Sequence, residues 1–355
     1  MHPVTVRILH PEAGPAAGPL ERSLAIARAA NGERLRSRFA ALGADAGIVA
    51  GPPDGQPFGA RLRALAGGLR GGGLVVLGSG AIPLATRRDL AAFVEAAASG
   101  ERRALANNRY SADVLAIGEL GPLRDLPDLP GDNALPRWLE EVAGFEVDDL
   151  RRRWRLGMDL DSPLDLVLLG GAAGPDAEAG AVAERLVAIR RTAADRRAEL
   201  VVAGRTSAAT LRWLERGTAS RVRALIEERG LRTSGRQGAG SDAGAGGRSA
   251  RGPRSVLGML LDERGPANLG AILGQLGDAA IVDSRVLLAH RLGADEAGWP
   301  APEDRFASDL LLAHRIADPW LRDLTTAARD AAIPVLLGGH SLVGPGIRLA
   351  LGARR

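Results

Sequence analysis

Leu74-Val75-Val76-Leu77-Gly78-Ser79-Gly80 is an unbroken apolar run that ends in Gly-Ser-Gly. A strand that is apolar on both faces must be covered on both faces, which is typical of a central strand in a parallel sheet. Ligands of open α/β sheets bind at the carboxyl ends of such strands. The glycines at 78 and 80 therefore mark both the end of this strand and a place where backbone N–H groups can approach a ligand.

Strands and helices alternate on both sides of this run. Short apolar stretches predict strands at residues 3–9, 46–50, 104–106 and 114–117. Apolar residues at helical spacing predict helices at residues 20–42, 58–69, 86–98 and 135–142. This βαβαβ order predicts an α/β domain with a mostly parallel, Rossmann-like sheet that is flanked by helices.

The second half of the chain repeats this alternation without an internal repeat. Strands are expected at residues 199–204, 279–283 and 333–339, and helices at 181–197, 207–215, 255–264, 266–276 and 318–331. We therefore expect two domains, an α/β domain at 1–170 and a second α/β domain at 180–355. Residues 234–254 are rich in Gly, Ser, Ala and Arg and predict a flexible insert in the second domain.

The composition limits the classes of function. The length of 355 residues suits two domains, and 46% hydrophobic residues suffice for two cores. All basic residues are arginines, they are interspersed with acids, and the net charge is only +4, so nucleic-acid binding is not expected. The absence of cysteine excludes disulfides and thiolate chemistry. With neither a signal peptide nor an apolar stretch long enough to span a membrane, the expected location is the cytoplasm.

The segment Met158-Asp159-Leu160-Asp161-Ser162-Pro163-Leu164-Asp165-Leu166 carries three acids at close spacing. Alternation predicts the end of a strand at residues 158–161, with Asp159 and Asp161 on one face. Ser162 then suits an N-cap and Pro163 the first helical position. Two carboxylates beside a helix N-terminus can hold a divalent cation and the phosphates bound to it. The alternative is a capped helix with solvated acids.

This segment is similar to the D-[IVL]-D-[ST]-P-x-D-L motif of GT-A-like nucleotidyltransferases. The guanylyltransferases of deazaflavin-cofactor biosynthesis (2-phospholactate guanylyltransferase) and of molybdenum-cofactor biosynthesis resemble it most. The resemblance covers roughly residues 1–170 and is firm over residues 159–166. It implies a GT-A fold, a bound nucleotide, and Mg²⁺ held by Asp159 and Asp161 as the catalytic residues.

The chain departs from that family at two places. Gly80 stands where the family usually has an aspartate that binds metal. The loop after the first strand contains Pro11, Pro15 and Pro19 in place of a glycine-rich triphosphate loop, and proline lacks the N–H donor that such a loop uses.

Two further polar stretches of the first domain are candidate binding sites. The loop at Gly78, Ser79 and Gly80 is expected to bind the nucleotide, and its alternative is a plain strand-to-helix turn. Residues Asn107, Asn108 and Arg109 lie between two predicted strands and carry good donors for phosphate or carboxylate. In the resembled family the equivalent region faces the acceptor substrate; the alternative is a solvated hairpin.

The second domain has its own candidate residues. Asp283 and Arg285 follow one predicted strand, His340 follows another, and Asp309 lies in a polar run between them. An Asp and a His at the carboxyl ends of neighbouring strands can form a small-molecule or metal site. His290 and His314 are alternative ligands.

These observations leave three functional hypotheses. The leading one is a Mg²⁺-dependent enzyme that moves a nucleoside monophosphate from an NTP to a phosphorylated small acid. The second is a non-catalytic binding or scaffolding module, for example within a homodimer. The third places the chemistry in the second domain around Asp283 and His340. Neither a nucleic acid nor a membrane is an expected partner in any of them.

Overall fold

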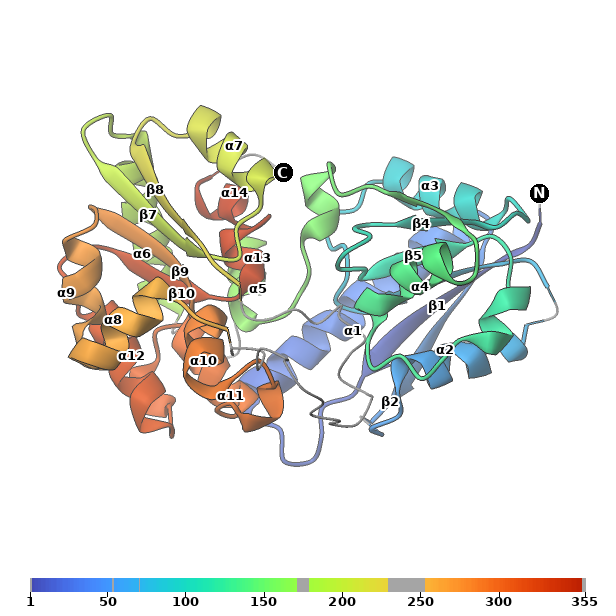
Figure 1. Cartoon of the computed structure of the whole chain (residues 1–355), viewed down its shortest axis with the longest axis horizontal. Helices are drawn as coiled ribbons and strands as arrows, with labels where there is room; N and C mark the ends of the chain where they lie inside the picture. Colours follow the sequence, from blue (N-terminus) through green and yellow to red (C-terminus); the bar gives the residue numbers. More distant parts are fainter. Residues whose placement is uncertain (1, 53, 70, 171–178, 229–252, 353–355) are drawn as a thin grey trace, which may run out of the picture. The chain divides into compact units, whose positions relative to one another are not determined.

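The computed structural model describes residues 2–52, 54–69, 71–170, 179–228 and 253–352 (Figure 1). These residues belong to two compact units. The first contains the chain through Ala16 and Ala25–Leu160, and the second contains Ala17–Leu24 and the described residues from Asp161 onward. The division therefore falls inside the acidic segment, between Leu160 and Asp161. Nearly all of the insert predicted at residues 234–254 lies outside the described residues.

The first unit is built on a six-stranded sheet in the order β2-β1-β3-β5-β4-β6. Its strands are β1 (Val4–Pro11), β2 (Asp45–Gly51), β3 (Gly73–Gly78), β4 (Arg103–Ala106), β5 (Val114–Ile117) and β6 (Glu146–Asp149). Every neighbouring pair is parallel except the two that involve β5, which runs in the opposite direction. The α/β class with a mostly parallel sheet is thus confirmed.

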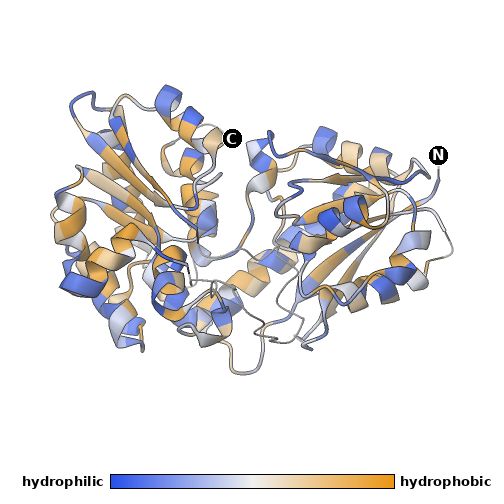
Figure 2. Ribbon diagram, in the orientation of Figure 1, coloured by the Kyte–Doolittle hydropathy of each residue, from blue (hydrophilic) through white to orange (hydrophobic). Residues whose placement is uncertain are grey.

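Helices cover both faces of this sheet, as the central strand requires. Val75 and Leu77 of β3 pack in one core cluster with Phe39 of α1 (Pro19–Ala40) and residues of α3 (Arg87–Ala97). Val76 points to the other face and packs with Leu62 of α2 (Phe58–Gly67) and residues of α4 (Leu135–Glu141). In Figure 2 the strands are mainly orange (hydrophobic), because both of their faces are covered. The helices show both orange and blue, because one side of each faces the sheet and the other faces solvent.

The second unit has a four-stranded parallel sheet in the order β10-β9-β7-β8. Its strands are β7 (Glu199–Gly204), β8 (Arg221–Ile226), β9 (Ala279–Asp283) and β10 (Val335–Gly338). Its helices are α5 (Pro163–Leu168), α6 (Ala179–Ala194), α7 (Ala208–Gly217), α8 (Val256–Arg264), α9 (Leu269–Gly274), α10 (Ser284–Leu292), α11 (Pro302–Asp309), α12 (Pro319–Arg329), α13 (His340–Val343) and α14 (Ile347–Ala350). Helix α6 contacts β7, β9 and β10, and α11 and α12 contact β10.

The structure differs from the sequence-based expectation at several places, and helices α10 and α11 are among the elements that were not predicted. Strands β6 and β8 were not predicted, because each lies at a sheet edge and carries charged residues instead of an apolar run. Residues 158–161 are not a strand: a 3₁₀ turn at Trp154–Gly157 precedes them, and Asp159 forms only an isolated bridge. Within the described ranges, every helix is too short or too polar to traverse a lipid bilayer.

Candidate functional site

In the first unit, polar groups gather at the carboxyl ends of β1 and β3. The chain passes from β1 to β2 on one side and then to β3 on the other, so the strand order reverses between β1 and β3. Such a reversal is where open α/β sheets bind their ligands. The Ser79 N–H donates to the Leu9 carbonyl at 2.8 Å, and His10 Nδ1 lies 2.9 Å from Ser79 Oγ. These bonds fix the start of the predicted nucleotide loop beside the end of β1.

Asp159 is held against this same loop. Its backbone forms an isolated antiparallel bridge with Ala81, and the next N–H, that of Leu160, donates to the Gly80 carbonyl at 2.9 Å. Asp159 is 7% exposed, so its carboxyl group is largely withdrawn from solvent. Two segments that the sequence predicted separately, the loop at Gly78–Gly80 and the carboxylate at 159, are therefore brought together.

The space beside Gly80 is occupied by an arginine. Arg28 Nε donates to the Leu160 carbonyl at 2.7 Å. A Cβ on Gly80 would lie 3.2 Å from Arg28 Nε and 3.1 Å from the Leu160 oxygen, which is closer than ordinary van der Waals contact. Because glycine has no Cβ at this position, the guanidinium of Arg28 can approach the loop. The loop continues into Ile82, a fully buried residue with a φ of +42°, and such strain is common at functional sites.

His10 and Asn31 complete this edge of the first sheet. Burial lowers the pKa of His10; the nearby charge of Arg28 adds to this shift, and that of Glu12 opposes it, so the site favours the neutral imidazole. The Asn31 amide donates to the carbonyls of Ser79 and Ala81 at 2.8 and 3.0 Å. Sequence reasoning did not single out His10 or Asn31 as site residues. The position of His10 at the end of the first strand was the signal that could have found it.

The predicted polar residues between β4 and β5 make internal bonds. Asn107 is 1% exposed; its amide donates to Asp113 Oδ2 and to the Leu156 carbonyl, and its own oxygen accepts from two backbone N–H groups. Asn108 accepts from the Tyr110 N–H, and Arg109 pairs with Glu140. These bonds account for the polarity of the turn without a ligand.

In the second unit, three of the predicted residues belong to ion pairs: Asp283, Arg285 and Asp309. Asp283 ends β9 and accepts from Arg205, which follows β7, at 2.6 and 3.1 Å. Gly204 has a φ of +131°, and a Cβ there would lie 2.2 Å from Asp283 Cβ. The sharp turn from β7 toward Arg205 thus requires glycine. Arg205 is a further polar residue that the sequence did not single out.

Arg285 and Asp309 form a second, deeper pair. The guanidinium donates to both carboxylate oxygens at 2.6 Å, and both side chains are at least nine-tenths buried. Burial acts to lower the pKa of Arg285, but the adjacent Asp309 carboxylate outweighs it and keeps the guanidinium charged. This pair is saturated, so its members brace β9 and α11 and leave few donors for a ligand.

Asp161 and His340 lie close together at the surface of the second unit. Asp161 Oδ2 is 3.9 Å from His340 Nδ1, at the start of α13. A carboxylate oxygen and an imidazole nitrogen at this separation can share one metal ion. Among the alternative ligands, His290 pairs with Asp262 and accepts from the Ser255 N–H, whereas His314 is exposed in a 3₁₀ turn.

Behind Asp161, Asp165 caps helix α5. One oxygen of Asp165 accepts from the Asp161 N–H, the Ser162 N–H and the Ser162 hydroxyl at 2.9, 2.7 and 3.2 Å. The sequence correctly predicted Ser162 as N-cap and Pro163 at the first turn. Burial, together with the charge of Asp161, raises the pKa of Asp165 to about 7.

Comparison of the chain with protein-family models, with curated proteins and with solved structures found no match.

Proposed function

We propose that the first unit binds a nucleoside triphosphate and Mg²⁺ at the carboxyl ends of β1 and β3, and transfers the nucleoside monophosphate to a phosphorylated small acid. The observation that carries this proposal is the bridge between Ala81 and Asp159. It places Asp159 beside the Gly78–Gly80 loop, at the point between β1 and β3 where the strand order reverses. A loop of this kind can present N–H groups to phosphates, and a carboxylate beside it can hold the cation that the phosphates carry.

Each residue has a stated role in this proposal. Asp159 binds Mg²⁺, and the cation neutralises charge on the phosphates. Gly78, Ser79 and Gly80 admit the phosphate chain, while Arg28 supplies positive charge at the place where the resembled family has an acid. Asp161, the second ligand expected from the sequence, is the first residue of the other unit and stays a prediction.

The proposed reaction needs little covalent chemistry from the protein. An oxygen of the acceptor phosphate, already ionised at neutral pH, attacks the α-phosphorus and forms a new P–O bond. The bond between the α-phosphorus and the bridging oxygen breaks, and pyrophosphate leaves with the electron pair. Catalysis then depends on positioning and on charge stabilisation. A cytoplasmic location, where NTPs are available, fits this proposal.

A thermal-shift panel tests it directly. GTP, CTP, ATP and UTP are each added with and without Mg²⁺ to the wild-type chain, to Asp159→Asn and to Glu95→Gln, an exposed acid of the same unit that serves as control. A ligand at one hundred times its Kd adds about 2.7 kcal/mol to the stability of the folded state. We expect a Mg²⁺-dependent shift with one nucleotide that survives in Glu95→Gln and is lost in Asp159→Asn. No shift with any nucleotide would instead favour a non-catalytic binding module.

A second candidate function rests on the proximity of Asp161 and His340. In this alternative the second unit binds a divalent cation or performs acid–base chemistry at the carboxyl end of β10. His340→Ala would then abolish turnover while Asp159→Asn would leave it unchanged. The two variants together distinguish the two sites.

A further inference from the structure

The first unit contains a pocket at the opposite edge of its sheet. It is a cavity of about 320 Å³, lined by residues that precede β1, β3 and β4 and by residues that follow β5. Because β5 is antiparallel to its neighbours, all these segments meet at the amino-terminal edge of the parallel strands. Ser79 lies at the carboxyl end of β3, so the pocket is separate from the proposed nucleotide site. Its volume suits a small metabolite.

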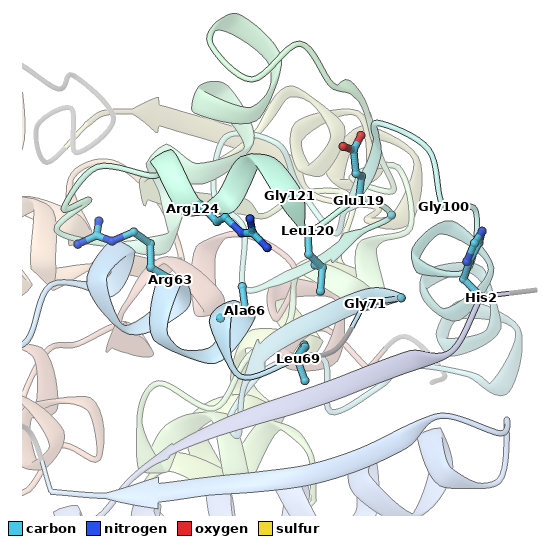
Figure 3. Close-up of a pocket in the computed structure, with 13 residues that line it drawn as sticks. His2, Arg63, Ala66, Leu69, Gly71, Gly100, Glu119, Leu120, Gly121 and Arg124 are labelled. Carbon is cyan, nitrogen blue, oxygen red and sulfur yellow. The ribbon is translucent and has the colours of Figure 1, made fainter.

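The charges around this pocket favour an anion. Arg63 donates to the Leu126 carbonyl and pairs with Asp128 at 2.6 Å, and the one acid of the lining, Glu119, pairs with Arg102 at 3.1 Å. Among the described residues, the Arg124 side chain has no hydrogen-bond or ion-pair partner. Figure 3 shows Arg124 near the middle of the lining, between Arg63 and His2. The charge of Glu119 is therefore neutralised by Arg102, whereas the positive charge of Arg124 has no counter-charge among the described residues.

Several glycines line the pocket. Gly67 is the last residue of α2 and has an ordinary φ, yet a Cβ there would meet nothing within 4 Å. Because Gly67 lines the pocket, a larger side chain at this position would project into the open space of the cavity. Ala66, Leu69 and Leu120 add a short apolar wall.

We propose that this pocket binds a small organic anion, a carboxylate or phosphate ester with a short hydrocarbon body, whose charged group is held by Arg124. The anion sits against the apolar wall and links the segments that lead into β1, β3 and β4. This site is independent of the proposed nucleotide site, so the failure of one proposal leaves the other standing.

Isothermal titration calorimetry tests the proposal with inorganic phosphate, glycerol 3-phosphate and succinate as probes. Comparing inorganic phosphate with glycerol 3-phosphate shows whether the phosphate group alone is enough or the hydrocarbon body is also needed. Succinate shows whether a carboxylate can replace the phosphate. Arg124→Gln removes the charge and Gly67→Leu fills the cavity. Arg88→Gln, an exposed arginine of the same unit that does not line the pocket, is the matched control.

We expect at least one probe to bind, with an affinity that falls about tenfold or more in Arg124→Gln, which corresponds to the loss of one charge-assisted hydrogen bond. Gly67→Leu should abolish binding, while Arg88→Gln and Asp159→Asn should leave it unchanged. Binding that persists in both pocket variants would overturn the proposal. So would the absence of binding by every probe up to ~10 mM, weaker than the affinity of an ordinary metabolite site.

Discussion

Arg285 and Asp309 face each other in the interior of the second unit, with both guanidinium–carboxylate contacts at 2.6 Å. A buried pair of this kind costs much in desolvation, and removing one partner leaves the other charged and unpaired. We expect Asp309→Asn to lower the unfolding free energy by about 3–5 kcal/mol. Urea denaturation followed by circular dichroism measures this loss. The double variant Arg285→Met/Asp309→Leu should lose less than Asp309→Asn, and a greater loss in the double variant would contradict the argument.

The raised pKa of Asp165 predicts a pH dependence of stability. Its pKa is 3.8 when unperturbed and about 7 in the folded protein, so between these values the folded state holds a proton that the unfolded state lacks. The contribution of Asp165 to stability therefore falls as pH rises from about 4 to about 7, by up to about 4 kcal/mol, and is constant above that.

Asp165→Asn removes this titration. The stability of the variant relative to wild type should rise with pH across the same window, as urea denaturation at several pH values would show. Glu215→Gln, an exposed acid of the same unit, is the control. A difference between Asp165→Asn and wild type that does not change with pH would show that Asp165 titrates normally.

Gly204→Ala should destabilise the second unit strongly. The residue has a φ of +131°, and its new Cβ would lie 2.2 Å from Asp283 Cβ, so both the backbone and the Arg205–Asp283 pair must shift. We expect a loss of about 2 kcal/mol or more, in the range of strained backbone positions. Gly298→Ala is the control, since its Cβ meets nothing within 4 Å. Equal melting temperatures for the two variants would rule out the close approach.

Gly80→Asp tests the role given to Arg28. The new carboxylate would sit beside Arg28 Nε, where an ion pair would cancel the positive charge that the proposal assigns to phosphate binding. We expect nucleotide affinity to fall in Gly80→Asp about as much as in Arg28→Gln, each measured by titration calorimetry. Gly131→Asp adds the same charge at a position with open space and should bind as wild type does. Tighter Mg²⁺-nucleotide binding in Gly80→Asp would instead show that the site lacks a metal ligand there.

Much of the fold follows from short-range patterns. The bounds of β7 and β9 match the apolar runs at residues 199–204 and 279–283, and Ser162 caps its helix as expected. These elements could be predicted because an apolar run or a capping side chain acts within a few residues of the chain. Strands β6 and β8 could not, since an edge strand is specified by its neighbour more than by its own apolar residues.

The sequence by itself determined the α/β class, the order of most elements and the acidic segment around Ser162, because periodicity and caps are local properties. Only the tertiary structure decided that Asp159 pairs with Ala81, that Arg28 approaches Gly80, and that Arg285 meets Asp309. These partners lie 78, 52 and 24 residues apart along the chain, respectively. Closing the chain between such partners costs conformational entropy, and this cost is offset only by the packing of whole sheets and helices. No local sequence pattern therefore predicts these contacts.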